Sequence, residues 1–178
     1  MKVRLRVYGP LLVAGLFWGG LEGKAGVVGF CALFAAGVLI WTLLEYLIHR
    51  FAFHGFAPHW QHHHDPIDPA FILAPLWLSL SASGVLWVLL SVAAHSAARG
   101  ALMAAGIVAG YLAYELVHLR IHGRAAGGPV LRGLRKHHYY HHFASDRVCY
   151  GVTSPLWDLV FGSSAGKTRS VTLRRELP

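Results

Sequence analysis

Charged residues are scarce in this 178-residue chain. They make up 13% of it, whereas a typical soluble domain carries roughly 25%. Cysteine is also scarce: Cys31 and Cys149 are far apart, and neither lies in a CxxC pair, so we expect neither a disulfide framework nor a thiolate metal site. Hydrophobic residues reach 55% and the mean hydropathy is +0.47. This composition indicates one domain embedded in a membrane.

The apolar residues are gathered in four blocks, which predict an all-α bundle of about four transmembrane helices. A span needs about 20 apolar residues. Three blocks reach this length, but the first is shorter and contains Pro10. A half-embedded segment or a cleaved signal peptide is the alternative for that block. The expected spans are residues 7–21, 25–48, 70–94 and 100–119.

The basic residues predict the orientation of the bundle. The chain has 16 Lys and Arg against 8 Asp and Glu. With the N-terminus in the cytoplasm, four spans return the C-terminus there, and only Lys24 and Arg99 fall outside. This bias explains the positive charge without a nucleic-acid partner. We therefore expect a multi-pass membrane protein with a cytosolic helical cap over residues 49–69 and 120–162. Residues 1–162 would form the single domain, followed by a basic, mobile tail over 163–178.

Histidine is in excess, with 13 residues, of which only His95 falls on the predicted outer side. The others form four groups on the cytoplasmic side: HRFAFH from His49, HWQHHHDP from His59, HLRIH from His118 and HHYYHH from His137. Residues i and i+4 share one face of a helix, so an HxxHH group offers two adjacent faces that can reach two different ions. Imidazole suits iron, zinc, copper and nickel, so the ligand type alone does not name the metal.

Two carboxylates lie close to the histidines in otherwise uncharged spans. Glu45 precedes His49 by four residues, and Glu115 precedes His118 by three. Ionisable groups in a span are costly and mark candidate functional sites. Metal-bound histidines usually donate their second N–H to a carboxylate or a carbonyl. We expect Glu45 and Glu115 to support the histidines in this way, with pairing to a nearby arginine as the alternative.

This ordered set of groups resembles the histidine boxes of the fatty acid hydroxylase and sterol desaturase superfamily. The segment GVTSPLWDLVFG, residues 151–162, is similar to the family's closing segment. We interpret it as structural, with Trp157 and Phe161 packing a short helix and Asp158 capping or pairing it. The resemblance covers residues 45–162 and implies a small membrane bundle whose cytosolic cap holds a dimetal centre. It implies ten ligands: His49, His54, His59, His62, His63, His118, His122, His138, His141 and His142.

The resemblance implies an oxidoreductase that uses O₂ and two iron ions to hydroxylate a membrane lipid, most simply a fatty acyl chain at C2. Zinc can occupy such sites in a purified sample. The reaction needs two electrons, and we expect no fused haem-type carrier domain. A separate ferredoxin, cytochrome or reductase is therefore the expected electron donor. Carotenoid or sterol hydroxylation or desaturation is the alternative. A second alternative is a non-catalytic metal-binding protein or transporter, which would need ligands near mid-membrane.

Overall fold

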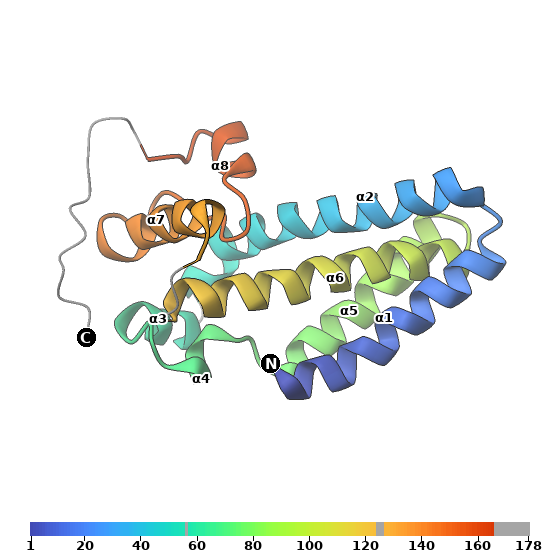
Figure 1. Cartoon of the computed structure of the whole chain (residues 1–178), viewed down its shortest axis with the longest axis horizontal. Helices are drawn as coiled ribbons and strands as arrows, with labels where there is room; N and C mark the ends of the chain where they lie inside the picture. The colour runs from blue at the N-terminus through green and yellow to red at the C-terminus, as the bar shows by residue number, and fades with distance from the viewer. Residues whose placement is uncertain (56, 124–126, 166–178) are drawn as a thin grey trace.

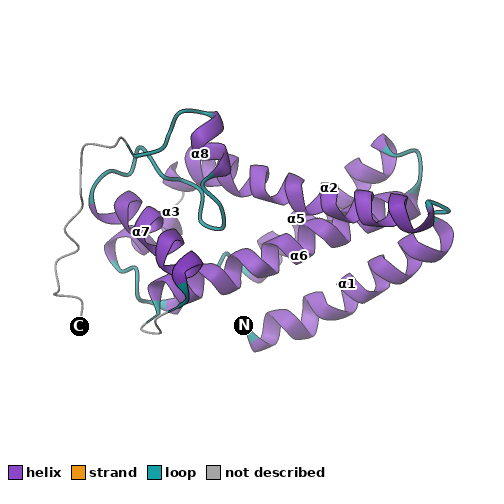
Figure 2. Ribbon diagram, turned by 45° about the horizontal axis from the view of Figure 1, so that its top comes forward, coloured by secondary structure: helices purple, strands orange, loops and turns teal. Residues whose placement is uncertain are grey.

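The computed structural model describes residues 1–55, 57–123 and 127–165, except the side chain of Pro69, and this part of the chain contains helices and no strand (Figure 2). Residues 166–178 of the predicted tail lie outside the described residues. Four long helices lie side by side (Figure 1): α1 (Lys2–Glu22), α2 (Gly26–Leu47), α5 (Leu76–Ala93) and α6 (Ala97–His122). The prediction of an all-α fold is confirmed.

Short helices form a cap at one end of this bundle (Figure 1). A π-helix, η1 (Ile48–Ala52), and a 3₁₀ turn, η2 (Phe53–Gly55), continue directly from α2. The linker to α5 contains α3 (Ala57–His64) and α4 (Pro69–Ile72), and the chain after α6 forms α7 (Pro129–Phe143) and α8 (Leu156–Val160). The short helices of the cap lie within residues 48–72 and 129–160.

Helix α6 is the centre of the bundle. It buries fifteen of its 26 residues, and it packs against α1, α2 and α5. Helix α5, which is described along its whole length, buries none. Its apolar side chains point outward, with both Trp77 and Val92 69% exposed. A soluble protein would rarely expose so continuous an apolar surface, whereas a membrane helix faces lipid in this way.

Among the described residues, three segments are long and apolar enough to cross a membrane: Gly26–Gly55, Ala70–Ala93 and Ala97–His122. Helix α1 is not among them, although it lies along α6 and its Tyr8 ring packs against Tyr111 at 5.5 Å. The fourth span therefore stays a prediction. The span expected over 70–94 overlaps the candidate span Ala70–Ala93. Within it the chain is extended at Leu73, and α5 begins only after Pro75. Proline disfavours helical backbone at the residue before it.

Two glycines bring α2 and α6 into backbone contact. A methyl group at Gly37 would overlap the carbonyl oxygen of Met103, and one at Gly106 would overlap that of Phe34. In lipid, helices associate mainly through close packing, and small residues at the crossing permit it. The crossing positions the end of α2, with its histidines, beside the end of α6.

We expect Gly106→Val to destabilise the bundle by about 1–3 kcal/mol, because overpacking forces the two helices apart. Thermal denaturation of the detergent-solubilised protein measures this. Gly84→Val is the matched control, since nothing lies within 4 Å of a methyl group at that position of α5. Equal melting temperatures for the two variants would contradict the proposed tight crossing.

Candidate metal centre

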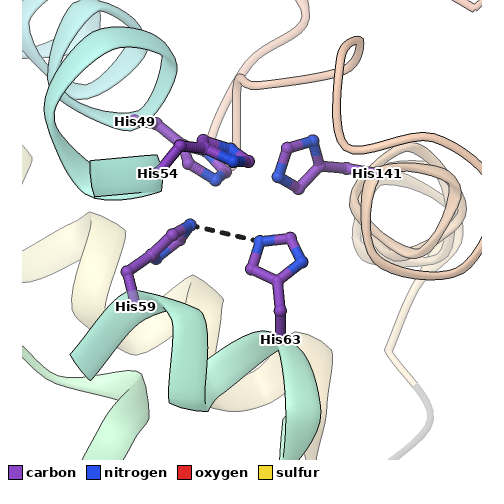
Figure 3. Close-up of side chains that lie close together, drawn as sticks. All are labelled: His49, His54, His59, His63 and His141. Carbon is purple, nitrogen blue, oxygen red and sulfur yellow. Dashed lines mark hydrogen bonds between the residues drawn. The ribbon is translucent and has the colours of Figure 1, made fainter. Parts of the chain in front are cut away.

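Histidine side chains from four regions of the fold converge in the cap. They form two groups, and within each group one ligand atom per residue lies within 4.8 Å of all the others. Group A comes from η1, η2, α3 and α7, and its rings are directed at a common centre (Figure 3): His49, His54, His59, His63 and His141. Group B comes from α3, α6 and α7: His62, His118, His122, His138 and His142. The structure thus brings together all ten histidines that the family resemblance singled out.

Helices α3 and α7 each contribute to both groups. In α3, His59 and His63 share one face and enter group A, whereas His62 lies on the adjacent face and enters group B. This is the division that the HxxHH spacing predicts. In α7 the division is reversed. The i,i+4 pair His138 and His142 enters group B, whereas His141 enters group A.

The pair His49 and His54 depends on a feature that the sequence reasoning missed. Five residues correspond to about 140° of net rotation on an α-helix, which would separate the two rings. The chain instead forms a π-helix over Ile48–Ala52, in which i→i+5 hydrogen bonds widen the turn. The two imidazoles are then stacked, with centroids 5.6 Å apart and an interplanar angle of 17°.

Nitrogen distances in group B fit a shared ion better than a hydrogen-bond network. The Nε2 atom of His138 lies 3.1 Å from that of His118 and 3.0 Å from those of His122 and His142. One ring nitrogen can make a single hydrogen bond, so it cannot satisfy three such neighbours. Two cis ligands at about 2.1 Å from one metal ion would be about 3 Å apart. The donor set therefore fits a metal ion.

Three histidines of the two groups, His62, His63 and His141, are uncharged at neutral pH, as metal ligands must be. Burial, reinforced by neighbouring histidines, lowers the pKa of His62 and His63 to about 4. Burial likewise lowers the pKa of His141 to about 3. Their lone pairs are available at pH 7, and such sites lose affinity in acid because protons compete with the metal.

The other three histidines lie outside both groups. His64 is exposed, and its ring packs on Trp60 with centroids 3.7 Å apart. His95 lies between α5 and α6, at the opposite end of the bundle from the cap (Figure 1). His137 pairs with Asp158, with Nε2 and Oδ2 2.9 Å apart. Their placement agrees with their omission from the predicted ligands.

The expected direct contact of Glu45 and Glu115 with histidines is wrong. Glu115 forms an ion pair with Arg4 of α1 at 2.8 Å. Pairing with an arginine is the alternative expected for this carboxylate, although the arginine is far away in the sequence. Glu45 accepts hydrogen bonds from the backbone N–H groups of Val152 and Thr153 at 2.7 and 2.8 Å. Each carboxylate is instead bound by a segment far away in the sequence.

The closing segment makes contacts that agree with a structural role. Trp157 of α8 and Phe161, the residue after α8, stack with centroids 6.0 Å apart, and Asp158 pairs with His137. Burial lowers the pKa of His137, but hydrogen bonds and charge attraction from Asp158 and Cys149 together outweigh this effect and raise the value to about 9. Burial raises the pKa of Asp158, but hydrogen bonds from His137, Gly151 and other donors hold it below the ordinary value. The pair is therefore charged at neutral pH.

An apolar pocket reaches both histidine groups from the bundle side of the cap. His59 of group A and His118 of group B both line it. Tyr114, one turn before His118 on α6, places its ring 5.3 Å from the imidazole. The rest of the lining is apolar side chains and backbone from η2, α3, α4 and the link to α5: Phe53, Pro58, Phe71, Ile72, Leu73, Ala74 and Pro75. The pocket thus brings a mostly apolar lining next to one histidine of each group.

The fold and the site together define a class of protein: a membrane-type helical bundle with a histidine-rich centre at the end of its long helices. Comparison with known families agrees with this class. The fatty acid hydroxylase model matches residues 34–163. The chain belongs to the fatty acid hydroxylase family.

Several characterised proteins are similar to this chain. A dihydroceramide fatty acyl 2-hydroxylase from Arabidopsis thaliana is 37% identical over 143 residues, covering 74% of this chain and 60% of the relative. The fatty acid 2-hydroxylase of Homo sapiens is 34% identical over 146 residues, covering 74% and 39%. The chain thus spans well under two thirds of the length of these relatives.

A solved structure supports the fold. The structure of full-length scs7p, in which only the hydroxylase domain is visible, superimposes with a TM-score of 0.83 at 29% identity. The match covers 94% of this chain and 67% of that one. The alignment therefore extends over nearly the whole bundle and cap described above.

The buried ion pair of Arg4 and Glu115 gives a stability prediction. Removing one partner alone, as in Glu115→Gln, should cost about 3–5 kcal/mol because it leaves a buried charge uncompensated. The double variant Arg4→Met with Glu115→Leu should recover much of that loss in thermal denaturation. Arg6→Met, at an exposed position of the same helix, is the control. Losses that simply add in the double variant would show that the two charges are not coupled.

Proposed function

We propose that this protein is an O₂-dependent hydroxylase of a fatty acyl chain in a membrane lipid, with one iron ion held by each histidine group. The observation that carries the proposal is the apolar pocket, which is lined by one histidine from each group. The names of the relatives support an acyl substrate and attack at C2. No comparable observation favours a carotenoid or a sterol.

A metal transporter fits this arrangement poorly. Transport ligands lie along a path near the middle of the membrane. Both histidine groups lie in the cap instead, beside the ends of α2 and α6. In our proposal a lipid chain would enter the site from the bundle, while small co-substrates would arrive from water.

The reaction inserts one oxygen atom of O₂ into a C–H bond, and two electrons and two protons convert the other atom to water. Two bound irons would supply the redox chemistry for O₂ activation. The chain's own part is to hold ten neutral imidazoles in place and to orient the acyl chain. The apolar lining around Tyr114 and Phe71 would exclude water from the reacting carbon.

The electrons would come from a separate ferredoxin, cytochrome or reductase. We place its docking site, the metal centre and both termini on the cytoplasmic side. The support for this orientation is the concentration of Lys and Arg in the cap regions of the sequence. A basic face would attract an acidic electron-transfer partner.

Two metal ions per chain are expected in gently purified protein, measured by elemental analysis. Either His118→Ala or His142→Ala removes a group B ligand, and each should lower the content toward one ion. His95→Ala should keep both ions, because His95 lies outside the two groups. Zinc in place of iron would be consistent with the site, whereas metal-free wild-type protein would contradict the proposed centre.

Cells that express the protein should accumulate 2-hydroxylated acyl chains in an O₂-dependent manner, as measured by lipid mass spectrometry. His118→Ala and His142→Ala should abolish the product while the variants still elute as folded protein in detergent. Full activity in either variant would overturn the ligand assignment. A hydroxylated carotenoid or sterol as the sole product would overturn the acyl substrate.

A further inference from the structure

The segment between α7 and α8 contributes two backbone carbonyls to group A. The carbonyl oxygen of Val148 lies 2.8 Å from Nδ1 of His141, and that of Tyr150 lies 2.5 Å from Nδ1 of His49. A carbonyl only accepts hydrogen bonds, so Nδ1 must carry the proton in both rings. The Nε2 atoms of both rings are left with their lone pairs, buried and without a hydrogen-bond partner among the described residues. Segment 148–153, here called the carbonyl loop, thus selects the nitrogens that face the centre.

Two buried carboxylates hold the carbonyl loop in place. Asp158 accepts hydrogen bonds from the N–H groups of Tyr150 and Gly151 at 2.9 and 2.8 Å. Glu45 accepts from the next two residues and also from the Thr153 hydroxyl, whose Oγ1 lies 2.6 Å from Oε2. Asp158 is fully buried and Glu45 is 5% exposed, so water does not replace these bonds.

The backbone of the carbonyl loop would not adopt this shape by itself. Cys149, between the two carbonyls that contact histidines, has a φ of +62°. A residue with a side chain is disfavoured in this left-handed region by about 1–2 kcal/mol. The surrounding residues must therefore hold this conformation in place. Asp158 does so by accepting hydrogen bonds from the two N–H groups that directly follow Cys149.

Group B is supported differently. The Nδ1 atoms of His138 and His142 are buried and have no hydrogen-bond partner in the described part of the chain. The carbonyl loop does not reach them. A change in the carbonyl loop should consequently alter the orientation of the group A histidines before that of group B.

We propose that Asp158 is a positioning residue that acts through the carbonyl loop to orient His49 and His141 in group A. The proposal rests on the proposed function, because it takes the two histidine groups as metal sites. Residues that support metal ligands in this way typically contribute about 10–100-fold to metal affinity. Asp158 would exert that effect on one of the two ions.

The test is the metal content of Asp158→Asn under graded chelator challenge. An amide cannot accept from both N–H groups and from the Ser163 hydroxyl, which lies 2.8 Å from Oδ1. The variant should release one of its two ions at about 10–100-fold lower chelator concentration than wild type, and keep the other. Asp68→Asn is the matched control, because Asp68 only caps α4 through the Ala70 N–H and asparagine caps equally well.

Combination with ligand variants identifies the ion that is released. Adding Asp158→Asn to His54→Ala, which already weakens group A, should cause no further loss of metal. Adding it to His122→Ala, which weakens group B, should leave the protein almost metal-free. Equal loss from both groups, or wild-type chelator resistance in Asp158→Asn, would overturn the proposal.

A milder variant serves if Asp158→Asn does not fold. Ser163→Ala removes one hydrogen bond to the carboxylate and should shift chelator resistance of one ion in the same direction by a smaller factor. Resistance equal to wild type would overturn the positioning role. If the proposed function were wrong, the wild-type protein itself would not hold two ions, and this result distinguishes that failure from failure of the positioning role.

Discussion

The cap of this protein is organised around buried imidazole nitrogens that are directed at one another. Leaving a buried acceptor without a partner costs about 1–3 kcal/mol, and several ring nitrogens of the two groups are in that position. Packing alone would not favour such an arrangement. A metal ion bound there would convert these lone pairs into ligands, and its binding energy would become part of the stability of the cap. The π-helix after α2, the two faces of α3 and the placement of α7 all follow from this requirement.

Buried carboxylates connect the metal centre to the rest of the fold. Glu115 joins α1 to α6 through Arg4, while Glu45 and Asp158 fix the loop whose carbonyls contact group A. All three are buried, and the partners of Glu45 and Glu115 named here come from distant parts of the chain. Buried charges and polar bonds are costly when incomplete, which favours one well-defined arrangement of the site over many similar ones. The apolar helices of the bundle pack against one another, and these few polar contacts fix the position of the cap relative to the bundle.

The predictable part of the structure consists of features with a local cause. Long apolar blocks placed the three candidate spans, and the i,i+4 spacing of histidines predicted that α3 and α7 would each serve two centres. The extended backbone between α4 and α5 has a local signal in Pro75. The π-turn that pairs His49 with His54 had only the unusual five-residue spacing as its signal. The partners of Glu45 and Glu115 had none, because they lie about 107 and 111 residues away in the sequence.

The sequence by itself determined the chemistry: an apolar all-α bundle, ten imidazoles at ligand spacing, and a family whose members carry them in this order. These properties depend on composition and on helical periodicity, which act over a few residues. The tertiary structure alone decided how the ten divide into two groups of five, and which carboxylate supports which segment. It also decided that Tyr150 and Val148 contribute through their carbonyls rather than their side chains. A backbone carbonyl is present at every residue, so only the fold can select the ones that orient a ligand.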